Sequence, residues 1–234
     1  MKLLAIETSS KLCGACLCED NKLIDKIEID NGLTHSQNLM PIIKDLLEKN
    51  NTNISDIDGF ICDIGPGSFT GIRIGVATAK AFVDTKSNPL YTGVSSLETL
   101  SYNIKNNGYI ASVIDCKNNN CYYSLYKLEN NEYKEIIAPT ASSINEMIEQ
   151  VSTIDSKITF VGDGSSNYKN DILSILPNSI ISEENLNIIK TENLALAGYK
   201  KIISNSTLEL TPLYLKKSQA ERLLEEKNNN HNNK

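Results

Sequence analysis

The run Gly65-Pro66-Gly67-Ser68-Phe69-Thr70-Gly71-Ile72-Arg73-Ile74-Gly75 carries the most structural information in this sequence. It follows an apolar segment, 59–64, that is typical of a buried strand, and it leads into helical spacing of apolar residues over 70–85. A glycine-rich turn between a strand and a helix exposes backbone N–H groups, which together with the helix dipole favour an anion. No Lys-Ser or Lys-Thr follows the glycines, as a P-loop requires, and the third glycine comes too late for a dinucleotide fingerprint.

The same run also has a packing interpretation. Gly71, Gly75 and Ala79 recur every four residues, so one face of the predicted helix lacks side-chain bulk. Small-residue faces of this kind allow another backbone to approach closely. The sequence therefore leaves two uses for the run open, an anion site and a contact surface.

Outward from this run, apolar periodicity outlines the rest of the chain. The first half is predicted to contain strands at 2–8, 12–19, 23–29, 59–64 and 89–92, and helices at 34–50, 70–85 and 95–104. The second half repeats this order, with strands at 109–116, 121–128, 133–138, 157–161 and 179–182, and helices at 144–151, 168–176 and 194–203. Thr34 and Gln37 have the spacing of a capping box at the start of the first helix.

Each half therefore has the order β-β-β-α-β-α-β-α. Three meandering strands followed by alternating helices and strands predict an α/β fold of two duplicated lobes, each with a mixed sheet and helices on its faces. The polar segment 105–108 marks the boundary between them. We expect a first lobe over 1–105, a second lobe over 106–218, and a tail over 219–234 that is weakly helical and then disordered.

Composition excludes several classes of protein. The chain has 234 residues, 40% of them apolar, which is enough to build a buried core. Its 29 acidic residues outnumber its 23 basic ones, and the formal net charge of −6 argues against stand-alone nucleic-acid binding. No apolar run approaches the roughly 18 residues of a spanning helix. Glu7 also interrupts the apolar start that a signal peptide needs, so we expect a cytoplasmic protein without membrane contact.

Candidates for catalysis are few. The histidines are His35 and His231, and the sequence has no His-x3-His or His-Glu-x2-His metal pair. The six cysteines lack the second ligand pair that structural zinc requires. Asp115 beside Cys116 ends a predicted strand, but a nucleophile there has no histidine partner.

Two turns at predicted strand ends could face phosphates. Thr8-Ser9-Ser10 follows the first strand, and Gly162-Asp163-Gly164-Ser165-Ser166 follows a strand of the second half. Hydroxyl-bearing residues and glycines are also ordinary turn formers, so the residues alone leave a structural role open as well.

Several motifs carry a resemblance: Ile6-Glu7-Thr8-Ser9, Asp56-Ile57-Asp58, the run 65–75, Gly93-Val94-Ser95-Ser96-Leu97-Glu98-Thr99-Leu100, and Thr211-Pro212-Leu213-Tyr214-Leu215-Lys216. Together they resemble the TsaB (YeaZ) family, whose members act in the threonylcarbamoyladenosine modification of tRNA. The resemblance implies the actin/Hsp70/sugar-kinase (ASKHA) fold. Two departures are Lys216 in place of a closing arginine, and Asp115-Cys116-Lys117 where the family usually has Asp-Ala-Arg.

The resemblance also implies a role without catalysis. The family's catalytic partner, TsaD, carries a His-x3-His metal pair, and at the matching positions this chain has Ser96 and Leu100, which cannot replace two imidazoles on a metal. The implied function is an inactive subunit, without a cofactor, that supports TsaD in modifying adenosine 37 of tRNA. It would meet TsaE through the complex, contact tRNA only indirectly, and homodimerise when alone. Alternatives are an ATP-dependent kinase or ATPase of this fold, and a peptidase.

The resemblance gives two sets of site residues. Thr8, Ser9, Gly162 and Gly164 would line a vestigial nucleotide cleft, with their two turns facing each other across the lobes. The helices 34–50 and 70–85 would lie side by side as a docking face for TsaD. On that face the small residues would allow close approach, namely Gly71, Gly75 and Ala79. The apolar contact area would come from Leu39, Ile43, Ile72 and Val76. Gly75→Leu should then weaken association and leave the fold nearly intact, although the same face could instead pack on its own sheet.

Overall fold

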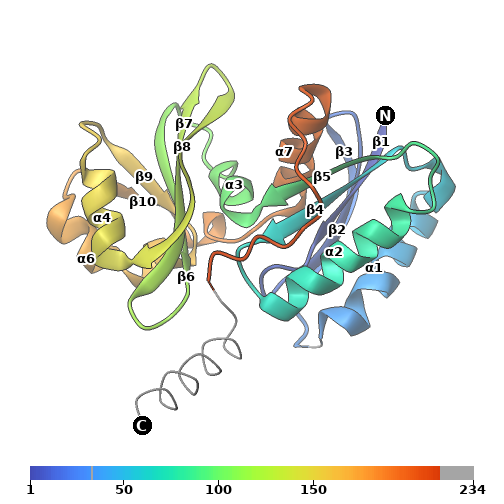
Figure 1. The fold of residues 1–234 in the computed structure, drawn as a ribbon, viewed down its shortest axis with the longest axis horizontal. Coiled ribbons are helices and arrows are strands. Elements are labelled where there is room, and N and C mark those ends of the chain that lie inside the picture. Colours follow the sequence, from blue (N-terminus) through green and yellow to red (C-terminus); the bar gives the residue numbers. More distant parts are fainter. Residues whose placement is uncertain (33, 217–234) are drawn as a thin grey trace, which may run out of the picture.

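The computed structural model describes residues 1–32 and 34–216, which form two lobes side by side, each built on a five-stranded sheet (Figure 1). The first sheet has the order β3-β2-β1-β4-β5, made from β1 (Lys2–Glu7), β2 (Cys13–Glu19), β3 (Lys22–Ile29), β4 (Gly59–Gly65) and β5 (Leu90–Ser95). The second sheet has the order β10-β9-β6-β7-β8, made from β6 (Gly108–Asp115), β7 (Asn120–Glu129), β8 (Glu132–Ser143), β9 (Ile158–Val161) and β10 (Ile180–Ile181).

Both sheets are mixed in the same way. In the first, β2 pairs antiparallel with β1 and β3, whereas β4 pairs parallel with β1 and β5. In the second, β7 pairs antiparallel with β6 and β8, whereas β9 pairs parallel with β6 and β10. The second sheet therefore repeats the first strand by strand, which confirms the predicted α/β fold with duplicated halves.

Helices cover the outer faces of both sheets. In the first lobe α1 (His35–Lys49) and α2 (Phe69–Val83) lie side by side on one face, as predicted (Figure 1). The predicted capping box closes the start of α1, where the N–H of Thr34 donates to Gln37 Oε1 at 3.2 Å. In the second lobe α4 (Ile144–Ser152) and α6 (Lys169–Ile175) bury Ile148 and Ile172 in that sheet's core.

One short helix replaces a predicted turn. Residues 163–167 form α5 (Asp163–Asn167), and the Ser165 hydroxyl donates to the carbonyl of Gly162 at 2.6 Å within its first turn. Its sequence, Asp-Gly-Ser-Ser-Asn, has no apolar period, so hydrophobic patterning could not reveal it.

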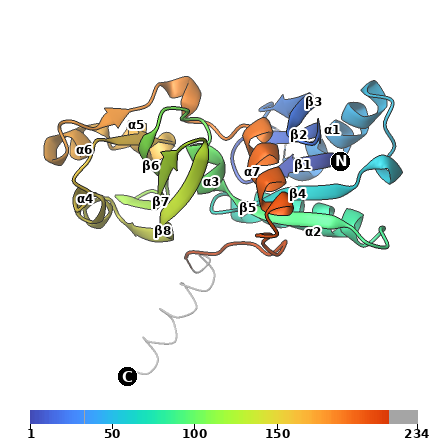
Figure 2. The same cartoon turned by 90° about the horizontal axis from the view of Figure 1, so that it is seen from above.

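The last helices of the two halves are exchanged between the lobes (Figure 2). The helix α7 (Thr191–Ile203) packs on the first sheet, where Leu194 joins Leu3 and Ala5 in one core. The helix α3 (Ser96–Ser101), from the first half, packs on β6 and β7. The helix α7 thus covers the first sheet although it follows the strands of the second lobe in the sequence, because the periodicity of a helix does not say which sheet it covers. The division of the chain at residue 105 stays a prediction.

The tail predicted over 219–234 lies outside the described residues. Within the described ranges, no helix combines the length and the apolar character needed to cross a bilayer.

Candidate functional site

The turn after β1 directs its hydroxyl groups into its own lobe. Thr8 and Ser9 are both buried, at 0% and 3% exposure. Thr8 Oγ1 donates to the carbonyl of Gly71 at 2.8 Å, and Ser9 Oγ donates to Glu7 Oε1 at 2.9 Å. Neither hydroxyl is free to contact a nucleotide without first breaking a buried hydrogen bond.

The glycine run lies directly over this turn. The N–H of Ser68 donates to the carbonyl of Ser9 at 2.6 Å, and the Ser68 side chain accepts from the N–H of Gly71 at 3.2 Å, which caps α2. A Cβ atom on Gly71 would lie 1.9 Å from the carbonyl oxygen of Thr8. The packing interpretation of the glycine run is therefore confirmed. The backbone that approaches these glycines closely is the chain's own turn after β1.

The residues expected to dock a partner are buried in the first lobe, so this prediction from the sequence is corrected. Gly71, Gly75 and Ala79 face the sheet rather than solvent, because a Cβ on Gly75 would lie 2.3 Å from Thr8 Oγ1 and 3.4 Å from Cys62 Sγ. Leu39, Ile43, Ile72 and Val76 lie in the same core, between 1% and 5% exposed. Small and large side chains thus share one buried stripe in α2, the stripe of α1 is made of large side chains, and all seven of the expected docking residues are buried in this fold.

Two carboxyl groups meet beneath the turn. Glu7 ends β1 and Asp63 lies near the end of the adjacent parallel strand β4, and both are fully buried. Glu7 Oε1 accepts three hydrogen bonds, from the N–H and hydroxyl of Ser9 and the N–H of Ser10, at 2.9–3.0 Å. Asp63 Oδ1 accepts from the N–H of Gly65 at 2.7 Å and from Ser96 Oγ at 2.6 Å.

The remaining oxygens require a shared proton. Glu7 Oε2 and Asp63 Oδ2 have no hydrogen-bond partner among the described residues, and the charge of Asp63 acts directly on Glu7. Two buried carboxyl groups that share one site do not both ionise, so one of them keeps its proton. Burial, together with the neighbouring Asp63 charge, raises the pKa of Glu7 well above its usual value. Burial also raises the pKa of Asp63, although the hydrogen bonds from Ser96 and from the N–H of Gly65 oppose the shift.

Ser96 and Leu100 are both interior residues. Ser96 Oγ also contacts Ser9 Oγ at 3.0 Å, which links the start of α3 to the β1 turn. Leu100 is 2% exposed and packs with Ile110 of the second sheet. Ser96 and Leu100 therefore both serve the junction between the lobes. Across residues 1–32 and 34–216, no three His, Cys, Asp or Glu side chains gather closely enough to hold a metal ion.

The corresponding turns of the second lobe are also occupied by internal contacts. The N–H of Gly162 donates to Asn187 Oδ1 at 2.8 Å, and a Cβ on Gly164 would lie 2.6 Å from Val113 Cγ1. A Cβ on Gly162 would lie 3.2 Å from Leu100 Cδ1, so this turn borders α3 at one end as Ser9 does at the other. The facing of the two turns across a nucleotide cleft stays a prediction.

Asp115 is fully engaged as an acceptor. It receives hydrogen bonds from the backbone N–H and the ammonium group of Lys117, from Tyr168 and from Asn167, at 2.7–3.0 Å. Burial acts to raise the pKa of this carboxyl, but these donors outweigh it and hold the pKa below its usual value. Asp115 therefore fixes the loop after β6, and the neighbouring Cys116, whose pKa burial raises, is not an activated thiolate.

Comparison with known proteins identifies the family. The family model "TsaD: tRNA N6-adenosine threonylcarbamoyltransferase" matches residues 32–234. The "tRNA threonylcarbamoyladenosine biosynthesis protein TsaB" of Bacillus subtilis is 28% identical over 223 residues, which cover 94% of this chain and 96% of that protein. The chain belongs to the TsaB (YeaZ) family. It falls within the wider family that the TsaD model describes.

Further TsaB relatives agree with this assignment. The protein of the same name from Escherichia coli is 29% identical over 161 residues, which cover 65% of this chain and 68% of that protein. The solved structure "YeaZ from Pseudomonas aeruginosa" has a TM-score of 0.75 at 23% identity and covers 92% of this chain and 99% of that one. The resemblance to the TsaB (YeaZ) family is thus confirmed, and so is the ASKHA-type fold.

Two TsaB-like motifs that lie far apart in the sequence meet on the surface. The N–H of Leu213 donates to the carbonyl of Ile64 at 2.8 Å, which places the closing motif beside the start of α2. Arg73 Nε then donates to the Tyr214 hydroxyl at 2.7 Å. Arg73 and Tyr214 belong to motifs that carry the family resemblance, but neither is among the site residues predicted from the sequence. The rarity of arginine, with Arg73 one of only two in the chain, was the available signal.

Proposed function

We propose that this chain is a non-catalytic partner subunit that supports TsaD in forming N6-threonylcarbamoyladenosine at position 37 of tRNAs. It acts in the cytoplasm without a cofactor, as a heterodimer with TsaD that meets TsaE through the complex and tRNA only indirectly. Alone, it pairs with a second copy. The names of its TsaB relatives and the match to the TsaD model support this proposal.

The main support for this proposal is that the polar groups at the carboxyl ends of the first sheet's strands point into the protein. The hydroxyl groups of Thr8, Ser9 and Ser96 donate hydrogen bonds to acceptors inside the protein. Phosphoryl transfer instead requires groups that face the substrate and position metal ions. A chain that retains the fold while burying these groups is suited to support a catalytic partner rather than to react.

The docking surface we propose is the outer face of α1 and α2. Since the residues first expected there are buried, contact must come from the side chains that the helices expose. Met40 is 51% exposed and Phe69 is 36% exposed, and Pro41 and Ala77 are exposed as well. Packing of this helix pair against similar helices of TsaD would bury these apolar groups in a four-helix contact.

Reconstitution tests this function. We expect the chain to co-purify with TsaD, and we expect TsaD with TsaE to modify tRNA only when the chain is present. Met40→Asp should weaken co-purification, because it places a charge in the proposed contact. Ile175→Asp is the matched control, since Ile175 is 56% exposed on α6 of the other lobe. Full modification without the chain, or equal effects of the two variants, would argue against the proposal.

The isolated chain is expected not to hydrolyse ATP above background, with or without a divalent metal. The physical reason is that Thr8 and Ser9 are tied to Gly71 and Glu7 and offer no free group to a phosphate. Phosphate release from the purified chain is the measurement. Turnover that disappears in Thr8→Ala or Gly164→Ala would favour the alternative function, a kinase or ATPase of this fold.

A further inference from the structure

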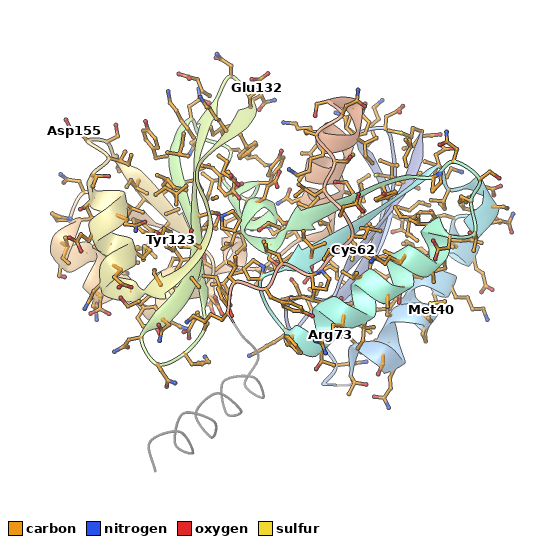
Figure 3. The ribbon with its side chains drawn as sticks, viewed as in Figure 1. Met40, Cys62, Arg73, Tyr123, Glu132 and Asp155 are labelled. Atoms are coloured by element: carbon orange, nitrogen blue, oxygen red, sulfur yellow. The ribbon has the colours of Figure 1, made fainter. Side chains whose placement is uncertain are left out.

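An exposed aromatic cluster holds Arg73 in one orientation. Phe69 and Tyr214 have ring centroids 4.8 Å apart and are 36% and 45% exposed. The guanidinium carbon of Arg73 lies 3.8 Å from the Phe69 centroid and 5.6 Å from the Tyr214 centroid. Together with the bond from Nε to the Tyr214 hydroxyl, these contacts fix the side chain at the start of α2 (Figure 3).

The guanidinium is fixed without being paired. Its Nε is the nitrogen that Tyr214 occupies, and no carboxylate among the described residues lies within 4 Å to form an ion pair with it. Arg73 is exposed, on the side of α2 opposite to the glycines that contact β1. Among residues 1–32 and 34–216 the two terminal nitrogens have no hydrogen-bond partner, which leaves a planar fork with the geometry that binds a carboxylate through two parallel hydrogen bonds.

The surroundings favour a protein carboxylate as the occupant. Nucleic-acid binding needs several cations along a surface, whereas this cluster offers a single guanidinium between two aromatic rings on a chain of net charge −6. The rings also require apolar contact, which a protein surface supplies around an acidic side chain. The cluster adjoins the α1–α2 face, and Met40 and Arg73 come from these two neighbouring helices (Figure 3).

We propose that Arg73, held by Phe69 and Tyr214, recognises a carboxylate of the TsaD partner at the edge of the α1–α2 contact. This inference rests on the proposed function, because it names the residue that sets partner choice at that same surface. Buried arginine and aromatic residues are typical of the positions that dominate binding energy in protein interfaces.

The test compares variants of one helix. Arg73→Gln removes the charge and the fork, and Arg73→Lys keeps the charge but loses the fork and the stacking. Lys80→Gln is the matched control, because Lys80 is exposed on α2 two turns further along. We expect Arg73→Gln to weaken the Kd for purified TsaD by about tenfold or more, Arg73→Lys to be intermediate, and Lys80→Gln to bind like the parent chain. The loss should shrink as salt concentration rises.

Each outcome bears on the inference. Unchanged melting of Arg73→Gln together with weaker TsaD binding supports it. Binding of Arg73→Gln as tight as that of Lys80→Gln contradicts it while leaving the proposed function standing. A loss confined to self-association assigns the cluster to a second copy and also contradicts it. Absence of TsaD binding by the parent chain contradicts the proposed function and this inference together.

Discussion

Leucine at Gly75 is expected to lower the melting temperature of the chain sharply, in contrast to the nearly intact fold that the sequence suggested. A Cβ there would lie 2.3 Å from Thr8 Oγ1, and the remaining leucine atoms would press on β1 and β4. Overpacking of a close-packed core costs about 3 kcal/mol or more when the backbone cannot move. For a chain of this size that corresponds to a loss of about 6–12 °C in Tm.

Ala77→Leu is the control for this substitution. Ala77 lies on α2 one half-turn from Gly75, on the exposed side, so the added bulk meets solvent. Thermal unfolding followed by circular dichroism compares the two variants directly. A second check uses Gly75→Ala, whose smaller penalty should be partly relieved by Thr8→Ala, because that change removes the hydroxyl in the clash. Equal melting of Gly75→Leu and Ala77→Leu would mean that the helix does not lie against the sheet as described.

Glu7→Gln is expected to stabilise the chain increasingly as pH rises. The pKa of Glu7 is raised in the folded state, so folding retains a proton that the unfolded chain releases above its ordinary value of 4.5. This contribution to stability is complete below that value and is lost as pH rises toward the folded pKa. Glutamine offers an N–H donor to Asp63 at every pH. The difference in unfolding free energy between variant and parent should therefore grow by about 1.4 kcal/mol per pH unit above about pH 5, until the folded pKa is reached.

Denaturant unfolding between about pH 5 and pH 8 measures this difference. Asp63→Asn should show the same trend, since it also removes one of the two acids. The double variant, Glu7→Gln with Asp63→Asn, is the sharper test. The oxygens of its two amides keep the acceptor bonds described above, which leaves two NH2 groups facing each other. We expect it to be less stable than either single variant. A pH-independent effect of Glu7→Gln, or additive gains in the double variant, would show that no proton is shared.

Local patterns predicted most of the fold. Apart from the short helix α5, apolar periodicity located the strands and helices of both halves, and the duplicated order followed from it. The spacing of Thr34 and Gln37 correctly marked the start of α1. Periodicity did not show that Gly71 and Gly75 belong to the buried stripe of α2, because a row of small residues has the same spacing whether it faces a sheet or solvent. It also could not place α7, since only the sheet it covers decides its lobe.

The candidate site depended on contacts between distant residues. Glu7 and Asp63 belong to strands separated by β2, β3 and α1, and parallel pairing of β1 with β4 brings them together. In the sequence, the available sign of this pair was an acidic residue at or near the end of each of these two apolar strands. Arg73 and Tyr214 lie 141 residues apart, and no short-range rule connects them. The resemblance to the TsaB family drew attention to both motifs, 65–75 and 211–216. Only the folded structure shows that they contact each other.

The exchange of α7 onto the first sheet also constrains how the chain folds during its synthesis. The strands of the first lobe leave the ribosome long before α7 does, because α7 is the last described helix in the sequence. Until it arrives, Leu3, Ala5 and Ile61 form an apolar face with no cover. A nascent chain paused within the second lobe therefore displays a surface suited to a chaperone. The first lobe completes its core only after the strands of the second lobe have been synthesised, so the two lobes mature together.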